Sequence, residues 1–262
     1  MRVGFIGAGN MASAIIKGMA GASLCNDVRV YDIDPAKTGD VCKKFGANPC
    51  SSKQEISEQC DFIFFAVKPN VMKGVINDIK SSINRNAVIV SIAAGKTLSF
   101  IEDAFDFEMP VIRVMPNINA LVGESMSALC RNAAVSDSAF QEVLRIFNSI
   151  GKAVELDEKY FNIFTGAAGS SPAFVYLFID SIARACVKAG LDKKTSLKIA
   201  AQTALGSAKT VLDSEKHPWE LIDMVCSPGG TTIEGVSSLL DDGFEGIVMR
   251  SVEKAINKGS KL

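Results

Sequence analysis

The stretch Gly4-Phe5-Ile6-Gly7-Ala8-Gly9-Asn10-Met11-Ala12 decides the fold. It follows a short apolar run and matches the pattern G-x-G-x-x-G/A, in which a glycine turn joins a strand to a helix. Gly7 permits the tight turn, Gly9 lets a pyrophosphate approach backbone N–H groups, and Ala12 allows close packing of helix on strand. The start of the helix offers partial positive charge to phosphates. A turn without a ligand fits this context less well, so we expect dinucleotide contacts at Ile6, Gly7, Ala8, Gly9, Asn10 and Met11.

An acid at the end of the second predicted strand bears on the choice of nucleotide. Asp32 lies 25 positions after Gly7 (32 − 7), close to the ~20 residues expected for an acid that accepts from the adenosine ribose. Asp32 and Asp34 together would repel a 2′-phosphate, whereas a free 2′-OH can donate to one of them. Asp34 is more simply interpreted as the N-cap of a helix beginning at Pro35, and Lys37 offsets part of the repulsion. The expected cofactor is NAD(P)H, with NADH favoured.

Apolar runs alternate with helical patterns through the first 157 residues. Near-continuous apolar runs suit strands buried on both faces of a parallel sheet. Strands that alternate with helices indicate a doubly wound α/β domain. Helices are expected at about 10–21, from Pro35, and at about 136–150. Strands are expected at 3–6, 28–32, 62–67, 87–92, 111–114, 125–129 and 153–156.

The pattern changes near Asp157, after which no convincing strand pattern occurs. Helices are expected at 172–190, from an Asp192 cap to about 212, from Pro218, and at 232–240 and 244–258. The first of these is apolar nearly all round, and a region of about 100 residues buries such a helix on all sides with difficulty. The sequence therefore predicts an α/β Rossmann-type N-terminal domain (1–157) plus an all-α C-terminal dimerisation domain (158–262), in a homo-oligomer built from dimers.

Composition excludes several classes of protein. Of 262 residues, 48% are apolar and 22% are charged, as in ordinary folded proteins. There are 28 basic and 29 acidic side chains, a net charge of −1, so neither nucleic acid nor an anionic membrane is expected as a partner. Charges spaced by four at Asp180, Arg184 and Lys188 argue against a membrane span there. Seven cysteines without a C-x-x-C pair, and a single histidine, His217, argue against disulfides or a metal site and favour a cytoplasmic location.

A second glycine-rich segment lies in the predicted helical domain. Gly229 and Gly230 directly precede a predicted helix, and Thr231 with Glu234 forms the capping-box pattern T-x-x-E for a helix starting at Thr232. Glycines before a helix N-terminus expose backbone N–H groups that suit a carboxylate or phosphate. An ordinary turn followed by a capped helix fits these residues equally well.

Together these segments resemble the pyrroline-5-carboxylate reductase family over essentially the full length. After Met115-Pro116-Asn117 many relatives have Thr-Pro, whereas this chain has Ile118-Asn119, which leaves the conformation of that loop open. The most specific similarity is Ser-Pro-Gly-Gly-Thr-Thr-Ile at 227–233. The other segments are the glycine-rich stretch, Ala-Val-Lys-Pro at 66–69, Ser-Ile-Ala-Ala-Gly at 91–95, Gly-Ser-Ser-Pro-Ala at 169–173 and His217-Pro218.

The resemblance implies reduction of the cyclic imine 1-pyrroline-5-carboxylate to L-proline, the last step of proline biosynthesis, by hydride transfer from NAD(P)H. It implies that the helical domain interlocks with a partner chain. Thr232 is expected to be the catalytic residue, hydrogen-bonded to the ring nitrogen and assisting proton delivery. Further cofactor contacts are implied for Ala66, Val67, Lys68, Pro69, Ile92, Ala93 and Ala94, and substrate contacts for Glu215, Ser227, Gly229, Gly230, Thr231 and Thr232.

Two other functions remain as alternatives. A hydroxyacid dehydrogenase or another imine reductase with a Rossmann domain is similar in outline, but the dehydrogenases place a catalytic lysine on the first long helix, and residues 172–179 contain none. A nucleotide-sensing protein without catalysis would not require the Gly-Gly-Thr-Thr segment or Glu215. His217, ahead of Pro218 at a helix start, is interpreted as structural rather than catalytic.

Overall fold

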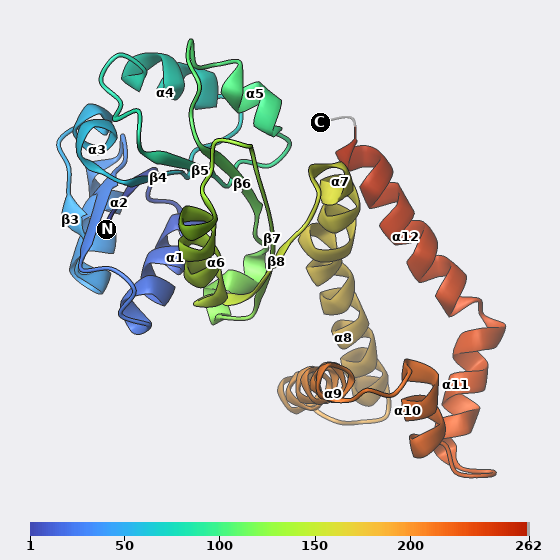
Figure 1. Cartoon of the computed structure of the whole chain (residues 1–262). Coiled ribbons are helices and arrows are strands. Elements are labelled where there is room, and N and C mark those ends of the chain that lie inside the picture. Colours follow the sequence, from blue (N-terminus) through green and yellow to red (C-terminus); the bar gives the residue numbers. More distant parts are fainter. Residues whose placement is uncertain (261–262) are drawn as a thin grey trace. The chain divides into compact units, whose positions relative to one another are not determined.

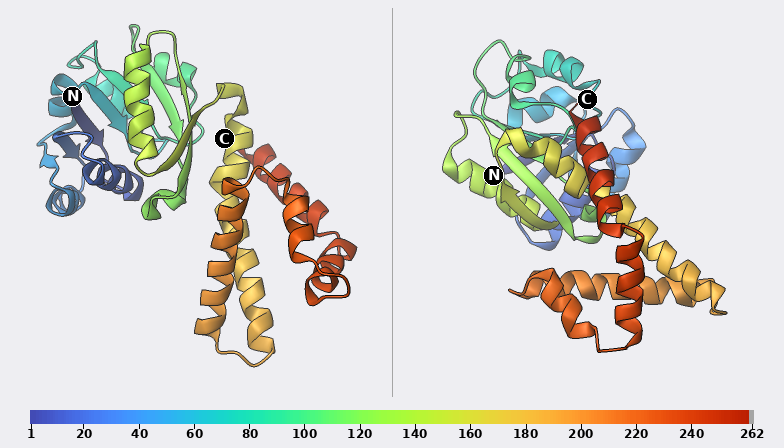
Figure 2. Two further views of the ribbon diagram at one scale, coloured as in Figure 1. Left: turned by 60° about the horizontal axis from the view of Figure 1, so that its bottom comes forward. Right: turned by 90° about the vertical axis from the view of Figure 1, so that its right-hand side faces the viewer.

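A computed structural model describes residues 1–260 of the chain (Figures 1 and 2). The chain forms two compact units, Met1–Gly169 with the chain end from Lys258, and Ser170–Asn257. The division falls after Gly169 rather than at the predicted 157/158. Residues just after 157 pack on the first unit, where the Phe161 side chain is 1% exposed in a cluster with buried residues of the sheet.

The first unit is built on one sheet with the strand order β3-β2-β1-β4-β5-β6-β7-β8 (Figure 1). Strands β1 to β6 are mutually parallel, β7 is antiparallel to β6, and β8 is parallel to β7. The order reverses between β1 and β4, which is where doubly wound sheets bind nucleotides. The strands are β1 Arg2–Ile6, β2 Asp27–Tyr31, β3 Asn48–Pro49, β4 Phe62–Phe65, β5 Val88–Ser91, β6 Val111–Met115, β7 Ser125–Arg131 and β8 Gly151–Glu155.

Helices cover both faces of this sheet because side chains alternate along its strands. Phe64 faces the cluster formed with α1, α2 and α6, and its ring stacks on Phe5 with centroids 4.5 Å apart. Ile63 and Phe65 face the cluster formed with α3, α4 and α5. The helices of this unit are α1 Asn10–Gly21, α2 Pro35–Phe45, α3 Lys53–Gln59, α4 Met72–Ile79, α5 Leu98–Glu102, α6 Asp137–Asn148 and α7 Phe161–Phe164, with the 3₁₀ turns η1 Ile118–Val122 and η2 Glu158–Tyr160 and the π-helix η3 Thr165–Ser170.

The regular elements described in the second unit are all helices, as predicted. They are α8 Ser171–Lys188, α9 Lys193–Asp213, α10 Pro218–Val225, α11 Thr231–Asp241 and α12 Phe244–Gly259, and the last two residues of α12 are grouped with the first unit. Helices α8 and α9 form a hairpin (Figure 2). Its turn contains Gly190 at φ +104°, and the Asp192 carboxylate caps α9 by accepting from the Thr195 N–H at 3.0 Å. Small buried residues, Ala183 and Ala200, permit the close packing. Within residues 1–260, no helix is both long and apolar enough to cross a membrane.

Candidate active site

The glycine-rich turn between β1 and α1 has the backbone geometry that a pyrophosphate site requires. Gly7 has φ +107°, and a Cβ atom there would lie 2.4 Å from the Ala66 carbonyl oxygen. The Gly7 N–H donates to the Tyr31 carbonyl at 2.7 Å, so the turn is held against both neighbouring strands. Gly9 is the N-cap of α1, no side chain caps the helix, and the space beside Gly9 is open. The first-turn N–H groups of α1 are therefore available to an anion.

Asp32 links this turn to the loop before α2. One carboxylate oxygen accepts from the Ala8 N–H at 2.8 Å and the other from the Asp34 N–H at 2.9 Å. The Asp32 N–H donates to the Thr38 hydroxyl at 3.0 Å. No residue pattern indicates this bridging role, because the partners of Asp32 are backbone groups 24 residues and two residues away. The prediction that Asp34 caps the next helix is confirmed, since its carboxylate accepts from the Ala36 N–H at 3.0 Å.

The other predicted cofactor contacts follow the carboxyl ends of β4 and β5. The strand register pairs Ile6 with Phe65 and Phe65 with Ser91, so the three strands end at one edge of the sheet. The backbone continues this pairing beyond the strands, with Ala66 N–H to Ile6 O at 2.9 Å and Ile92 N–H to Phe65 O at 3.3 Å. The structure therefore brings the segments 6–11, 66–69 and 92–94 together at one edge with Asp32.

An ion pair that the sequence did not reveal starts from the middle of β6. The Arg113 side chain is 8% exposed, and its guanidinium donates to Glu158 at 2.9 Å and lies 4.5 Å from the centroid of the Phe161 ring. Glu158 also accepts from the Leu98 N–H at 2.7 Å. The pair ties the segment after β8 to the centre of the sheet. No local pattern marks it, because its members are 45 residues apart.

The glycine segment of the second unit forms a turn directly before α11. The Gly230 N–H donates to the Ser227 carbonyl at 3.0 Å, and Gly229 has φ +67°, as in a type II turn with proline at its second position. The predicted capping box is wrong: α11 begins at Thr231, Gly230 is its N-cap, and no side chain caps it. The helix starts one residue earlier than predicted, so a glycine occupies the position assigned to a threonine. The N–H groups of the first turn are thereby left for an external acceptor.

The remaining predicted substrate residues lie at the two ends of α10. Glu215 is exposed in the connection before this helix, and the Ser227–Gly230 turn follows it. Eight residues of α-helix separate them, a length of about 12 Å. Thr232 is half-buried in the first turn of α11. His217 is the N-cap of α10, accepting from the Trp219 N–H at 3.3 Å, while Glu220 accepts from the His217 N–H at 2.8 Å. The expected structural role of His217 agrees with this capping box.

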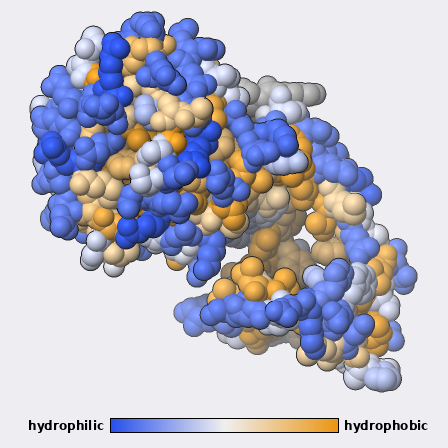
Figure 3. Space-filling model, viewed as in Figure 1, coloured by the Kyte–Doolittle hydropathy of each residue, from blue (hydrophilic) through white to orange (hydrophobic). Residues whose placement is uncertain are grey.

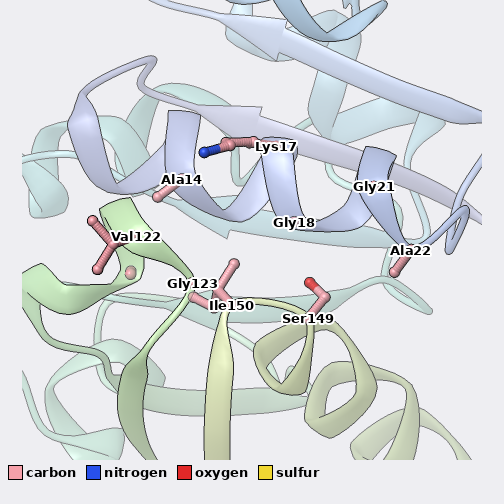
Figure 4. Close-up of a pocket in the computed structure, with 10 residues that line it drawn as sticks. Ala14, Lys17, Gly18, Gly21, Ala22, Val122, Gly123, Ser149 and Ile150 are labelled. Atoms are coloured by element: carbon pink, nitrogen blue, oxygen red, sulfur yellow. The ribbon is translucent and has the colours of Figure 1, made fainter. Parts of the chain in front are cut away.

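A pocket of about 340 Å³ on the first unit contains none of the predicted site residues (Figure 4). It lies between α1, the η1 turn and the turn before β8. Gly18 is required there by packing, since a Cβ atom would lie 2.4 Å from Ile150 Cγ2. The lining has one cation, Lys17, and the hydroxyl of Ser149 already donates to the Ile146 carbonyl at 2.6 Å. This pocket is therefore not a candidate active site.

A Rossmann-type sheet with a glycine-rich pyrophosphate turn, combined with a separate helical unit, defines a dinucleotide-dependent oxidoreductase. Two family models match the chain: "NADP oxidoreductase coenzyme F420-dependent" over residues 2–95 and "Pyrroline-5-carboxylate reductase dimerisation" over residues 158–262. The pyrroline-5-carboxylate reductase of Escherichia coli is 42% identical over 263 aligned residues, which cover 100% of this chain and 98% of that protein.

Solved structures agree with the sequence comparison. The pyrroline carboxylate reductase of Plasmodium falciparum, with NADP bound, is 35% identical with a TM-score of 0.87 over 99% of this chain and 97% of that one. The pyrroline-5-carboxylate reductase of Coxiella burnetii is 25% identical with a TM-score of 0.93 over the same shares. The chain belongs to the pyrroline-5-carboxylate reductase family.

Proposed function

We propose that the chain reduces 1-pyrroline-5-carboxylate to L-proline with NAD(P)H, the last step of proline biosynthesis. The observation that carries this proposal is the second anion site, the turn at Gly229 and Gly230 before the uncapped helix α11. The glycine-rich turn at Gly7 and Gly9 accounts for the cofactor pyrophosphate, so the second site is free to bind a substrate carboxylate. A hydroxyacid dehydrogenase is disfavoured, because residues 172–179 of α8 contain no lysine and the full-length relatives are named pyrroline-5-carboxylate reductases.

In the proposed mechanism, bound NAD(P)H supplies the hydride and the protein supplies orientation and electrostatics. The substrate carboxylate accepts from N–H groups at the start of α11, with Ser227, Gly229, Gly230 and Thr231 around it. The Thr232 hydroxyl lies one residue further into the helix than Thr231 and forms a hydrogen bond with the ring nitrogen of the substrate. A protonated iminium is a much better hydride acceptor than a neutral imine, and it can form from solvent, so Thr232 orients the ring and assists proton delivery without acting as a strong acid.

Glu215 is proposed to act through its charge. Its carboxylate is exposed and lies at the opposite end of α10 from the turn. It therefore does not compete with the substrate carboxylate for the N–H groups of α11. Across about 12 Å of helix, this exposed negative charge favours the protonated iminium over the neutral imine only weakly.

The cofactor is proposed to be NADH in preference to NADPH. Asp32 and Asp34 place two carboxylates beside the expected ribose position. The two lysines of α2 that face the glycine-rich turn each already pair with an acid, Lys37 with Asp34 at 4.0 Å and Lys44 with Asp40 at 3.9 Å. Both oxygens of Asp32 already accept a backbone N–H, but each retains a second lone pair for a ribose hydroxyl. A 2′-phosphate offers no donor and meets two negative charges.

The assembly is proposed to be a homo-oligomer built from dimers through the helical unit. A groove of about 840 Å³, formed by α8 with α11 and α12, is lined by apolar side chains such as Phe174, Phe178 and Phe244. Large apolar residues on these helices are exposed, among them Leu177 at 69% and Met249 at 62%, and Figure 3 shows apolar side chains gathered on this unit. Exposed apolar surface of this extent marks an interface, and the model matched at 158–262 describes dimerisation.

The compartment is proposed to be the cytoplasm. All seven cysteines are free thiols in the structure. Burial raises the pKa of Cys60 and of Cys130 to about 12, so these thiols stay protonated and unreactive. Thiols at these buried positions suit a reducing environment.

One assay separates an enzyme from a nucleotide-sensing protein. Purified protein is mixed with NADH, and 1-pyrroline-5-carboxylate is then added while the absorbance of the reduced cofactor is followed. Catalytic turnover must consume NADH in amounts far above the protein concentration. A protein that binds NADH but consumes no more than one equivalent is a sensor, and the proposed function is then wrong.

A further inference from the structure

The side-chain oxygen of Asn117 is buried without a hydrogen-bond partner. Among the described residues, Asn117 Oδ1 is the buried side-chain oxygen or nitrogen for which no partner is present. The residue is 6% exposed. Burying a carbonyl oxygen without a hydrogen-bond donor is unfavourable, so this unpartnered oxygen calls for an explanation. The proposed mechanism has not used this residue.

The rest of Asn117 is firmly anchored, so its free oxygen has a fixed position. The side-chain Nδ2 donates to the Ala168 carbonyl at 2.9 Å, and the backbone N–H donates to the Ser125 hydroxyl at 3.3 Å. Ala168 belongs to the π-helix η3, and π-helices occur frequently at functional sites. A Cβ atom at Gly169 would lie 3.4 Å from Met115 Cε, so this segment packs closely on the end of β6.

Strand β6 belongs to the second half of the sheet (Figure 1). Asn117 comes shortly after the carboxyl end of this strand, which is at Met115. In a doubly wound sheet each half holds one mononucleotide of the cofactor, at the carboxyl ends of its strands. The first half, β1 to β3, carries Asp32 and therefore holds the adenosine. The half formed by β4, β5 and β6 then holds the nicotinamide nucleotide, whose carboxamide has an NH₂ group with two donors.

From this placement we propose that Asn117 is a cofactor-binding residue whose Oδ1 accepts a hydrogen bond from the carboxamide NH₂ of the nicotinamide. The bond fixes the rotation of the ring and so determines which face of the nicotinamide is presented to the imine. The inference rests on the proposed function, because it requires a nicotinamide cofactor. It assigns a role to a residue that the substrate and pyrophosphate sites leave unused.

Equilibrium binding to the full-length protein tests the assignment with three nucleotides. NAD⁺ carries the carboxamide. 3-Acetylpyridine adenine dinucleotide replaces the NH₂ by a methyl group and keeps the carbonyl, and ADP-ribose lacks the ring. Calorimetry on the wild type is expected to give NAD⁺ an affinity about three- to tenfold above that of the acetyl analogue. In Asn117→Ala that ratio is expected to fall to about one, with ADP-ribose binding within about twofold of wild type.

Ser125→Ala is the matched control. It removes the acceptor for the Asn117 backbone N–H but leaves the Asn117 side chain unchanged, including the hydrogen bond from Nδ2 to the Ala168 carbonyl. The ratio of affinities for NAD⁺ and the acetyl analogue is therefore expected to persist. If the ratio also persists in Asn117→Ala, or if that variant weakens ADP-ribose equally, Asn117 is structural and the inference is overturned. Failure of the wild type to bind any of the three nucleotides overturns the proposed function as well. Normal binding without imine reduction overturns the proposed function alone.

Discussion

Replacing Thr232 by valine should impair imine reduction without disturbing the helix that carries it. Valine keeps the β-branched shape and removes the hydroxyl, and the two residues have similar helix propensities. The Thr232 hydroxyl does not cap α11, because no side chain accepts a capping hydrogen bond at the start of that helix. The variant should therefore fold as the wild type does, and any loss of activity reports on the hydroxyl itself.

The expected size follows from the proposed contact. A hydrogen bond to a charged or developing-charge group contributes about 1.5–3 kcal/mol, which corresponds to roughly a ten- to hundredfold fall in kcat/KM. The measurement is steady-state kinetics with varied 1-pyrroline-5-carboxylate at saturating NADH, together with the Kd for NADH. The Kd for NADH should stay within about twofold of the wild-type value, because the proposed nucleotide site lies on the first unit.

Ser237→Ala is the control for the Thr232 experiment, because it removes an exposed hydroxyl from the same helix. It should leave kcat/KM near the wild-type value. A Thr232→Val enzyme that keeps kcat/KM within twofold of wild type would refute the assigned role. A parallel loss in Ser237→Ala would mean that α11 as a whole, rather than the Thr232 hydroxyl, had been perturbed.

Three further predictions concern the cofactor, the assembly and the buried ion pair. Asp32→Asn should narrow the preference for NADH over NADPH by about five- to thirtyfold through the lost charge. Both Asp32→Asn and Asp32→Ser should lower the free energy of unfolding, because one backbone N–H loses its acceptor in the first variant and two lose it in the second. Kinetics with both nucleotides and urea unfolding measure these effects, and an unchanged preference would count against the role of Asp32. Leu177→Asp, at a side chain 69% exposed in one protomer, should dissociate the dimer in sedimentation velocity at low micromolar concentration, and an intact dimer would place the interface elsewhere. Arg113→Met should lower the free energy of unfolding by about 1–3 kcal/mol, because Glu158 loses its cation while keeping the Leu98 N–H; an unchanged urea midpoint would show that the pair contributes nothing.

Periodic and local signals were sufficient to predict much of the fold. The predicted strands at 3–6, 62–67 and 111–114 correspond to β1, β4 and β6, and the helix predicted at 10–21 matches α1. These elements are buried on a whole face or on both faces, so their apolar patterns are unambiguous. The edge strand β3 has two residues, and α5 has five. Segments that short contain too few residues for a period to be recognised.

The candidate site was predictable where a backbone conformation demands a particular residue. Gly7 and Gly229 both have positive φ, and each lies in a turn at which the sequence predicts anion binding. Roles that depend on distant partners were not predictable. The bridge from Asp32 to Ala8 and the anchoring of Asn117 to Ala168 join residues 24 and 51 positions apart. The error at Thr231 has a different cause: the T-x-x-E pattern caps a helix only when its threonine is the N-cap, and here Gly230 occupies that position, so Glu234 falls one residue too far into the helix.

Transfer of deuterium from the cofactor to the product tests the central claim most directly. The purified protein is incubated with 1-pyrroline-5-carboxylate and NADH deuterated at the transferred position of the nicotinamide, and the product is isolated and examined by mass spectrometry. The account predicts L-proline that carries one deuterium on the former imine carbon, in an amount equal to the NADH consumed. Oxidation of NADH without proline, or proline that carries no deuterium, would contradict it.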